Sequence, residues 1–172
     1  MRHLLILFYC QDPGWILFFA YLATLGFLAI WRSCGTRSWF RPLCSCLLLF
    51  WGYVLLQLTI LHRVPGSCDI RQPVPLHFLW QIYTTGNWEL LRSMFMNAAL
   101  FFPAGLLLTA LVPRSWSHRR ATVTVCLAFL LVSMAVEGLQ LVYAMGQAEA
   151  DDVLFNVLGA FLGTLPFPSQ RT

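Results

Sequence analysis

The stretch that decides the fold is residues 121–143, ATVTVCLAFLLVSMAVEGLQLVY. It exceeds the roughly 20 residues that a helix needs to cross the hydrocarbon core of a bilayer. Glu137 is its one charged residue. A helix that is apolar on nearly every side suits lipid or a large core better than water. The stretch therefore predicts a membrane-spanning helix.

The composition of the whole chain supports this reading. Hydrophobic residues make up 59% of the 172 residues and charged residues only 10%, against roughly 45–50% and 25% in soluble domains. A soluble globule of this size has too little interior for so much apolar surface. Disorder is excluded because it requires low hydrophobicity. We therefore expect a single transmembrane domain over residues 1–172.

Apolar segments predict an all-α, polytopic transmembrane helix bundle with about five spans. These are residues 15–31, 43–61, 94–112, 121–143 and 152–167. The connection 62–93 contains proline and glycine together with Trp80, Tyr83 and Trp88, which suit the membrane interface. We expect an interfacial segment there. Residues 1–10 resemble an interfacial stub or a helical lead-in to the first span more than a signal peptide, and whether residues 1–14 join that span stays open.

The charges of the connections predict an orientation. The 32–42 and 113–120 connections each carry three arginines and no acid, whereas 144–151 carries acids and no base. Because cytoplasmic connections are enriched in basic residues, we expect a multi-pass protein of the cell membrane with its N-terminus outside and its C-terminus in the cytoplasm. The arginines lie between apolar segments rather than on one face, so no nucleic-acid partner is expected.

Polar residues inside spans are costly and are therefore candidates for function. Glu137 lies in the fourth span with Gln140 three positions later, so the two side chains share a helix face. Ser133, four positions before Glu137, extends the same stripe.

The fifth span carries a second stripe. Asp152, Asn156, Gly159 and Gly163 recur at helical spacing, and the two glycines form a GxxxG pattern that permits close helix packing. Asp151 and Asp152 begin this segment, where a carboxylate can cap a helix.

The third span contributes Asn97, followed by Pro103 and Gly105. Proline should kink this helix, and we assign Pro103 and Gly105, with Gly159 and Gly163, to helix packing. In the predicted topology the polar residues gather in the outer half of the bilayer. The candidate ligand-binding residues are Asn97, Glu137, Gln140, Asp152 and Asn156.

The alternative is that these groups only pack helices, with Glu137 bonded to Asn97 or Asn156 and the aspartates serving as caps. Metal or cofactor binding is not expected, because the histidines lie outside the spans without ligand spacing and the six cysteines are scattered. The four histidines are His3, His62, His77 and His118.

Three ordered motifs resemble the VanZ-like family of bacterial membrane proteins. They are Asn97-Ala-Ala-Leu-Phe-Phe-Pro103-Ala-Gly105, Glu137-Gly-Leu-Gln140, and Asp151-Asp152-Val-Leu-Phe-Asn156-Val-Leu-Gly159-Ala-Phe-Leu-Gly163. Thr59 and Arg63 are also similar to a family pattern at the end of a span, so the resemblance covers about residues 50–165. Family members often carry an arginine shortly before the acidic motif, whereas residues 146–149 here are GQAE.

The resemblance implies a role at the cell envelope, because the founding member is linked to resistance to the glycopeptide teicoplanin. The first hypothesis is a binding protein. Its outer-leaflet polar site would hold a lipid-linked or amphiphilic ligand, such as a lipoglycopeptide or a cell-wall precursor, among membrane lipids. The amides would donate hydrogen bonds, and Glu137 and Asp152 would accept them or pair with a cation.

Other functions stay open from the sequence. An intramembrane enzyme acting on a lipid head group could use Glu137 and Asp152 as acid and base or as Mg²⁺ ligands, although no nucleophile constellation is visible. A small transporter is less favoured because no internal repeat is visible. An assembly factor is a further alternative, and the oligomeric state is not predicted.

Overall fold

The computed structural model describes residues 26, 30, 38–61, 67–68, 76–86, 88–146 and 149–167. The lead-in 1–14 lies outside the described residues, as does the predicted span 15–31 except for two positions. The chain divides into two units, Met1–Phe40 and Arg41–Thr172. The second unit contains all of the candidate site residues.

Helices account for nearly all of the regular structure in the described residues, as the apolar segments predict. The helices are α3 (Phe40–Leu56), continued by the π-helix η1 (Gln57–Leu61), then α4 (His77–Thr85), α5 (Glu89–Leu111), α6 (His118–Val142) and α7 (Ala150–Thr164). Two strands of two residues, β1 (Ser67–Cys68) and β2 (Met145–Gly146), pair in parallel.

Local sequence explains where several helices begin and end. The hydroxyl of Ser117 accepts a hydrogen bond from the backbone N–H of Arg120 at 3.3 Å. This N-cap satisfies one of the donors left over at a helix start, so α6 begins before the predicted residue 121. Helix α4 lies between two left-handed residues, Leu76 and Gly86, and glycine adopts that conformation at no steric cost.

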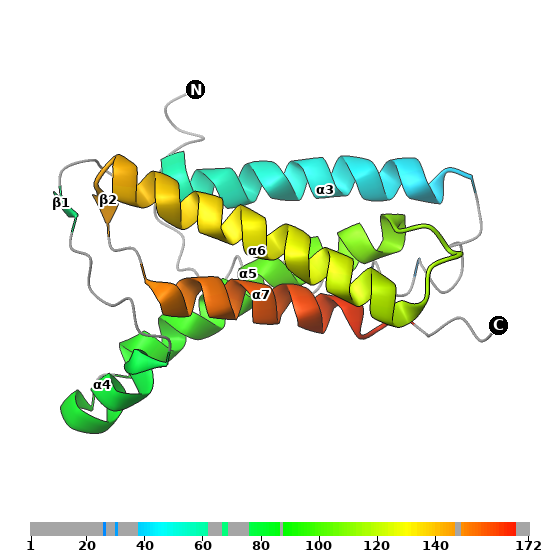
Figure 1. The fold of residues 1–172 in the computed structure, drawn as a ribbon. Helices are drawn as coiled ribbons and strands as arrows, with labels where there is room; N and C mark the ends of the chain where they lie inside the picture. The colour runs from blue at the N-terminus through cyan, green and yellow to red at the C-terminus, as the bar shows by residue number, and fades with distance from the viewer. Residues whose placement is uncertain are drawn as a thin grey trace. The chain divides into compact units, whose positions relative to one another are not determined.

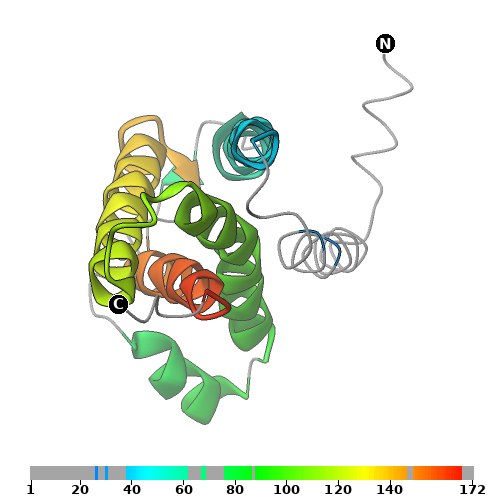
Figure 2. The ribbon, with the colours of Figure 1, turned by 90° about the vertical axis from the view of Figure 1, so that its right-hand side faces the viewer.

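Helix α7 is central in this unit (Figures 1 and 2). It lies between α5 and α6 and runs antiparallel to α6. The apolar core forms around it from Leu55, Phe101, Val125, Phe129 and Ala160. The rings of Phe101 and Phe129 meet edge to face, with centroids 5.9 Å apart, an arrangement that aromatic pairs prefer.

Helices α5 and α7 approach closely because glycines line their interface. A Cβ added at Gly159 would lie 2.7 Å from the carbonyl carbon of Ala98, and one at Gly105 would lie 2.7 Å from the Cα of Ala160. A Cβ at Gly163 would likewise meet the α5 backbone. Only residues without a side chain allow this separation, which is the role of small residues between membrane helices.

Helix α3 bonds to α5 through two side chains. Pro103 lies buried inside α5 and offers no N–H to the carbonyl four residues before it. That carbonyl belongs to Ala99. Trp51 Nε1 of α3 donates to the carbonyl oxygen of the next residue, Leu100, at 2.8 Å. Near the end of α5, Arg41 donates from its guanidinium to the Leu111 carbonyl oxygen at 2.6 Å. A positive charge is favourable at that helix end.

Three helical segments in the described residues are long and apolar enough to cross a membrane: Phe40–Leu61, Glu89–Leu111 and His118–Val142. They correspond to the predicted spans 43–61, 94–112 and 121–143. Helix α7 has 15 residues, or about 22 Å, which is less than the roughly 30 Å hydrocarbon core. The structure thus supports three spans rather than establishing five.

Candidate functional site

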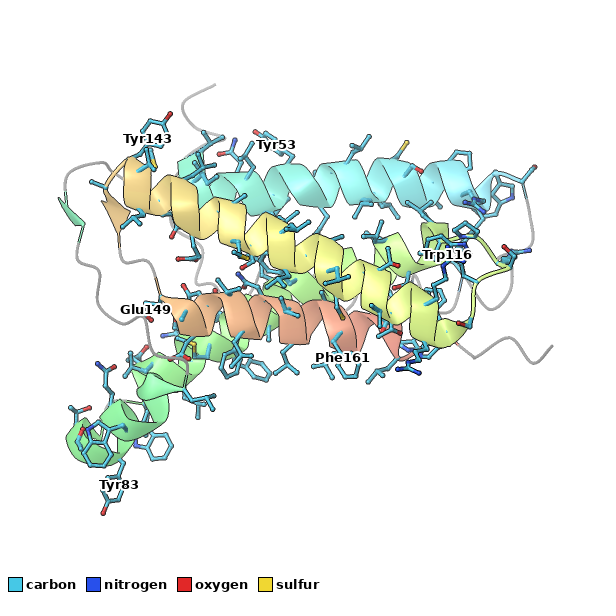
Figure 3. The ribbon with its side chains drawn as sticks, in the orientation of Figure 1. Tyr53, Tyr83, Trp116, Tyr143, Glu149 and Phe161 are labelled. Atoms are coloured by element: carbon cyan, nitrogen blue, oxygen red, sulfur yellow. The ribbon has the colours of Figure 1, made fainter. Side chains whose placement is uncertain are left out.

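The N-terminal end of α7 gathers acidic side chains. Glu149 is the N-cap residue, and Asp151 and Asp152 lie in the first turn. The start of a helix carries a partial positive charge from its unsatisfied N–H groups. Figure 3 shows Glu149 at the end of the bundle where α6 finishes near Tyr143, opposite the end that carries Trp116.

Asp151 connects this helix start to the chain just before α4. Its side chain is buried, and its Oδ1 accepts a hydrogen bond from the backbone N–H of Leu76 at 2.5 Å. The sequence indicated that Asp151 could cap a helix, but nothing in the sequence pointed to Leu76 as its donor.

Glu137 reaches the same helix start from α6. Its Oε2 accepts a hydrogen bond from the backbone N–H of Glu149 at 3.2 Å. A carboxylate from a neighbouring helix therefore satisfies a donor at the start of α7, a position where negative charge is favourable. This contact brings the stripe on α6 against the first turn of α7.

Asp152 bonds α7 to α5. Its Oδ1 accepts from Asn97 Nδ2 at 2.6 Å, a short distance that is typical of a charge-assisted bond. Helix α5 begins at Glu89 rather than at the predicted residue 94. Asn97 consequently lies about 12 Å along the helix axis from its start, deeper in the bundle than the sequence suggested.

Asn156 and Gln140 are the most deeply enclosed members of the candidate set. Asn156 is 4% exposed, and its Nδ2 donates to Ser133 Oγ at 2.8 Å. Gln140 is 1% exposed, and its Nε2 donates to the carbonyl oxygen of Thr59 in η1 at 2.9 Å. The stripe on α6 thus faces two neighbours, with Ser133 against α7 and Gln140 against η1.

Each of these two amides keeps an oxygen without a hydrogen bond. Gln140 Oε1 and Asn156 Oδ1 are buried and have no partner among the described residues. Thr59 offers a carbonyl, which only accepts, so the nitrogen of Gln140 must face it and the oxygen must be the unpartnered atom. A buried unsatisfied polar group costs about 1–3 kcal/mol.

The site is therefore rich in acceptors. The sequence suggested that the three amides donate to a ligand, but each amide nitrogen has an acceptor inside the bundle. Among the described residues, the buried side-chain atoms without a hydrogen-bond partner are the two amide oxygens of Gln140 and Asn156. In the described residues no group of three His, Cys, Asp or Glu side chains is arranged to hold a metal ion.

An apolar layer separates this site from the opposite end of the unit. The core around Phe101, Val125 and Phe129 lies between them. Beyond it Thr122 donates to the hydroxyl of Thr164 at 3.2 Å. Polar side chains therefore occur at both ends of the α6–α7 pair with aromatic and aliphatic groups between them.

Partners that the sequence did not reveal are mostly backbone atoms. The Thr59 carbonyl, the Leu76 N–H and the Glu149 N–H have no signature in residue type. The π-helix that presents Thr59 was also not expected, since the sequence predicted an ordinary span over 43–61. Ser133 was part of the predicted stripe, although its bond to Asn156 was not foreseen.

The chain also matches known proteins. A model of the VanZ/LLP1 family matches residues 65–169, beginning later than the predicted region 50–165 and leaving out Thr59 and Arg63. Over 80 residues the chain is 35% identical to Protein VanZ of Enterococcus faecium. The aligned residues make up 46% of this chain and 44% of that protein. The matched segment thus spans less than half the length of the relative.

No solved structure matches the chain. The family match covers well over half of the 172 residues and contains all five candidate ligand-binding residues. With three helices apolar enough to span a bilayer, the chain is a membrane protein and belongs to the VanZ/LLP1 family.

Proposed function

We propose that this protein binds the polar part of a lipid-linked or amphiphilic ligand in the outer half of the bilayer. The site lies where α7 begins, and its residues are Asn97, Glu137, Gln140, Asp152 and Asn156. A cell-wall precursor or a lipoglycopeptide is a suitable ligand, and such binding would alter glycopeptide susceptibility, as the family membership suggests.

The observation that carries the proposal is the pair of unpartnered, buried amide oxygens. Packing alone would favour apolar side chains at Gln140 and Asn156, because leaving their oxygens unsatisfied costs free energy. An apolar surrounding with a few convergent polar groups is typical of a small-molecule site.

The proposed orientation rests on charge. Arg114, Arg119 and Arg120 lie at one end of α5 and α6, whereas Glu149, Asp151 and Asp152 begin α7 at the other end. Cytoplasmic ends of membrane proteins are enriched in arginine, so we assign the acidic end to the outside. We retain five spans, an outside N-terminus and a cytoplasmic C-terminus as part of the proposal.

Binding of a lipidated glycopeptide to the full chain in nanodiscs tests the proposal. We expect saturable binding that weakens at least about fivefold in Gln140→Met, since a buried polar group of the ligand left without its hydrogen-bond partner costs about 1–3 kcal/mol. Thr122→Val is the matched control, because it removes an internal hydrogen bond at the opposite end.

Both variants are first checked for an unchanged elution volume in size-exclusion chromatography. Equal affinity of wild-type protein and Gln140→Met for the ligand contradicts the assignment of the site. The same loss in Thr122→Val would indicate a general effect of destabilisation instead.

A further inference from the structure

A second charged surface lies at the start of α6, at the end of the unit that Trp116 marks in Figure 3. Arg119 and Arg120 are exposed there and form no salt bridge among the described residues. The guanidinium carbon of Arg120 lies 4.2 Å from the centroid of the partly buried Trp116 ring. This cation–π contact holds the group in place while its N–H edges can still donate hydrogen bonds.

The acidic side chains of the described residues lie far from this surface. Glu137 follows Arg119 on α6 at a distance of about 27 Å along the helix axis. The three acids at the start of α7 lie near the end of α6, because α7 runs antiparallel to it. Glu89 begins α5, whose opposite end leads to α6. The described part of the unit therefore leaves the charge of the two arginines without a nearby carboxylate.

An exposed apolar strip continues from Arg119 along α6. Val123 and Leu127 follow at intervals of four residues, and they are 50% and 54% exposed. Residues at this spacing are neighbours on one helix face. Because helical side chains lean toward the N-terminus of their helix, Arg119 extends from the strip toward the end of the bundle. The face combines a positive head with an apolar body.

The chemistry of this face matches an anionic phospholipid. Helix α6 is long and apolar enough to cross a bilayer, and Arg119 is its second residue, so the guanidinium groups lie at the depth of the lipid head groups. Arginines at that depth are attracted to an anionic leaflet, and indole rings are enriched there. Since a leaflet presents a layer of phosphates rather than one atom, the two arginines need not converge on one group.

We propose that this face of α6 binds an anionic phospholipid, with the phosphate on Arg119 and Arg120 and an acyl chain along Val123 and Leu127. An acidic protein would use the arginines but would not account for the apolar strip beside them. The surface and the proposed ligand-binding site lie at opposite ends of α6, so this inference does not depend on the proposed function.

The experiment measures lipid binding to the full chain in mild detergent by native mass spectrometry. It compares phosphatidylglycerol with phosphatidylcholine of the same acyl chains. We expect a preference for phosphatidylglycerol of about twentyfold, because each arginine near an anionic surface contributes about fivefold. The preference should decrease as sodium chloride is added, since exposed charges are screened by salt.

Substitutions link this preference to the two arginines. The double variant Arg119→Gln, Arg120→Gln should bind both lipids equally, whereas the double lysine variant keeps the charges and should keep the preference. Arg92→Gln is the matched control, because it removes an exposed arginine at the other end of α5, 3.2 Å from Glu89, and should leave the preference unchanged. All variants are first checked for an unchanged elution volume in size-exclusion chromatography.

Three results would overturn the inference. One is an unchanged preference in the double glutamine variant, and another is an equal loss in Arg92→Gln, which would indicate a general effect of net charge. The third is displacement of phosphatidylglycerol by glycerol 3-phosphate or by polyglutamate at the same ionic strength, which would assign the surface to a free phosphate or to an acidic protein. Binding of a glycopeptide is tested separately by Gln140→Met, so the two proposals can fail independently.

Discussion

The contact between α5 and α7 yields the sharpest prediction about stability, through the substitution Gly159→Ala. The added Cβ would meet the backbone of Ala98, lying 2.7 Å from its carbonyl carbon and 2.8 Å from its Cα. Ordinary van der Waals contact begins at 3.4 Å. The two helices must therefore separate by at least about 0.7 Å at this point, and by more to clear the carbonyl oxygen.

The loss of stability in Gly159→Ala depends on which atoms must move to admit the new Cβ. The obstructing atoms are backbone atoms and cannot move by changing rotamer, so we expect overpacking near the upper end of its usual range, about 3 kcal/mol. Alanine recovers about 1 kcal/mol through its better helix propensity. The net loss of unfolding free energy is about 2 kcal/mol. A shift of this size also lengthens the bond between Asn97 and Asp152 from 2.6 Å to about 3.3 Å.

The assay is reversible unfolding in mixed detergent micelles, titrated with sodium dodecyl sulfate and followed by tryptophan fluorescence. Gly138→Ala is the matched control, because nothing lies within 4 Å of a Cβ at Gly138. That variant should be unchanged or stabilised by up to about 1 kcal/mol. Ala98→Gly should not rescue Gly159→Ala, since the obstruction is backbone. Equal stability of the Gly159 and Gly138 variants would refute the reasoning.

Two further substitutions test individual hydrogen bonds with the same unfolding assay. Trp51→Phe keeps an aromatic ring but removes the donor to the Leu100 carbonyl, so we expect a loss of about 1 kcal/mol; an unchanged midpoint would mean that this bond adds no stability. Asn97→Leu removes a donor to the Asp152 carboxylate and should cost about 1.5–3 kcal/mol, whereas a more stable variant would contradict the role of this bond in joining α5 to α7.

Much of the helical architecture is predictable because the apolar segments are long and nearly free of charge. The segment 121–143 predicts α6 to within a few residues, and the spacing of Gly159 and Gly163 predicts a face for close packing. Helix boundaries are less predictable. Helix α5 begins at Glu89, five residues before the predicted span, because the charged residues Glu89 and Arg92 interrupt the apolar pattern there without interrupting the helix.

The candidate residues were also identifiable, since polar groups inside apolar segments are rare and costly. Their bonding partners were not. Helical spacing predicts that Glu137 and Gln140 share a face, but it does not say that one meets the start of α7 while the other meets the Thr59 carbonyl.

The sequence by itself determined that this is an apolar helical protein with polar residues concentrated on three helices. Only the tertiary structure decided which atoms of those residues are satisfied and which are not. The reason is physical: periodicity along one helix specifies a face, whereas a hydrogen bond between helices depends on their relative rotation and axial shift. That geometry occupies the amide nitrogens at this site and leaves the oxygens of Gln140 and Asn156 without a partner among the described residues.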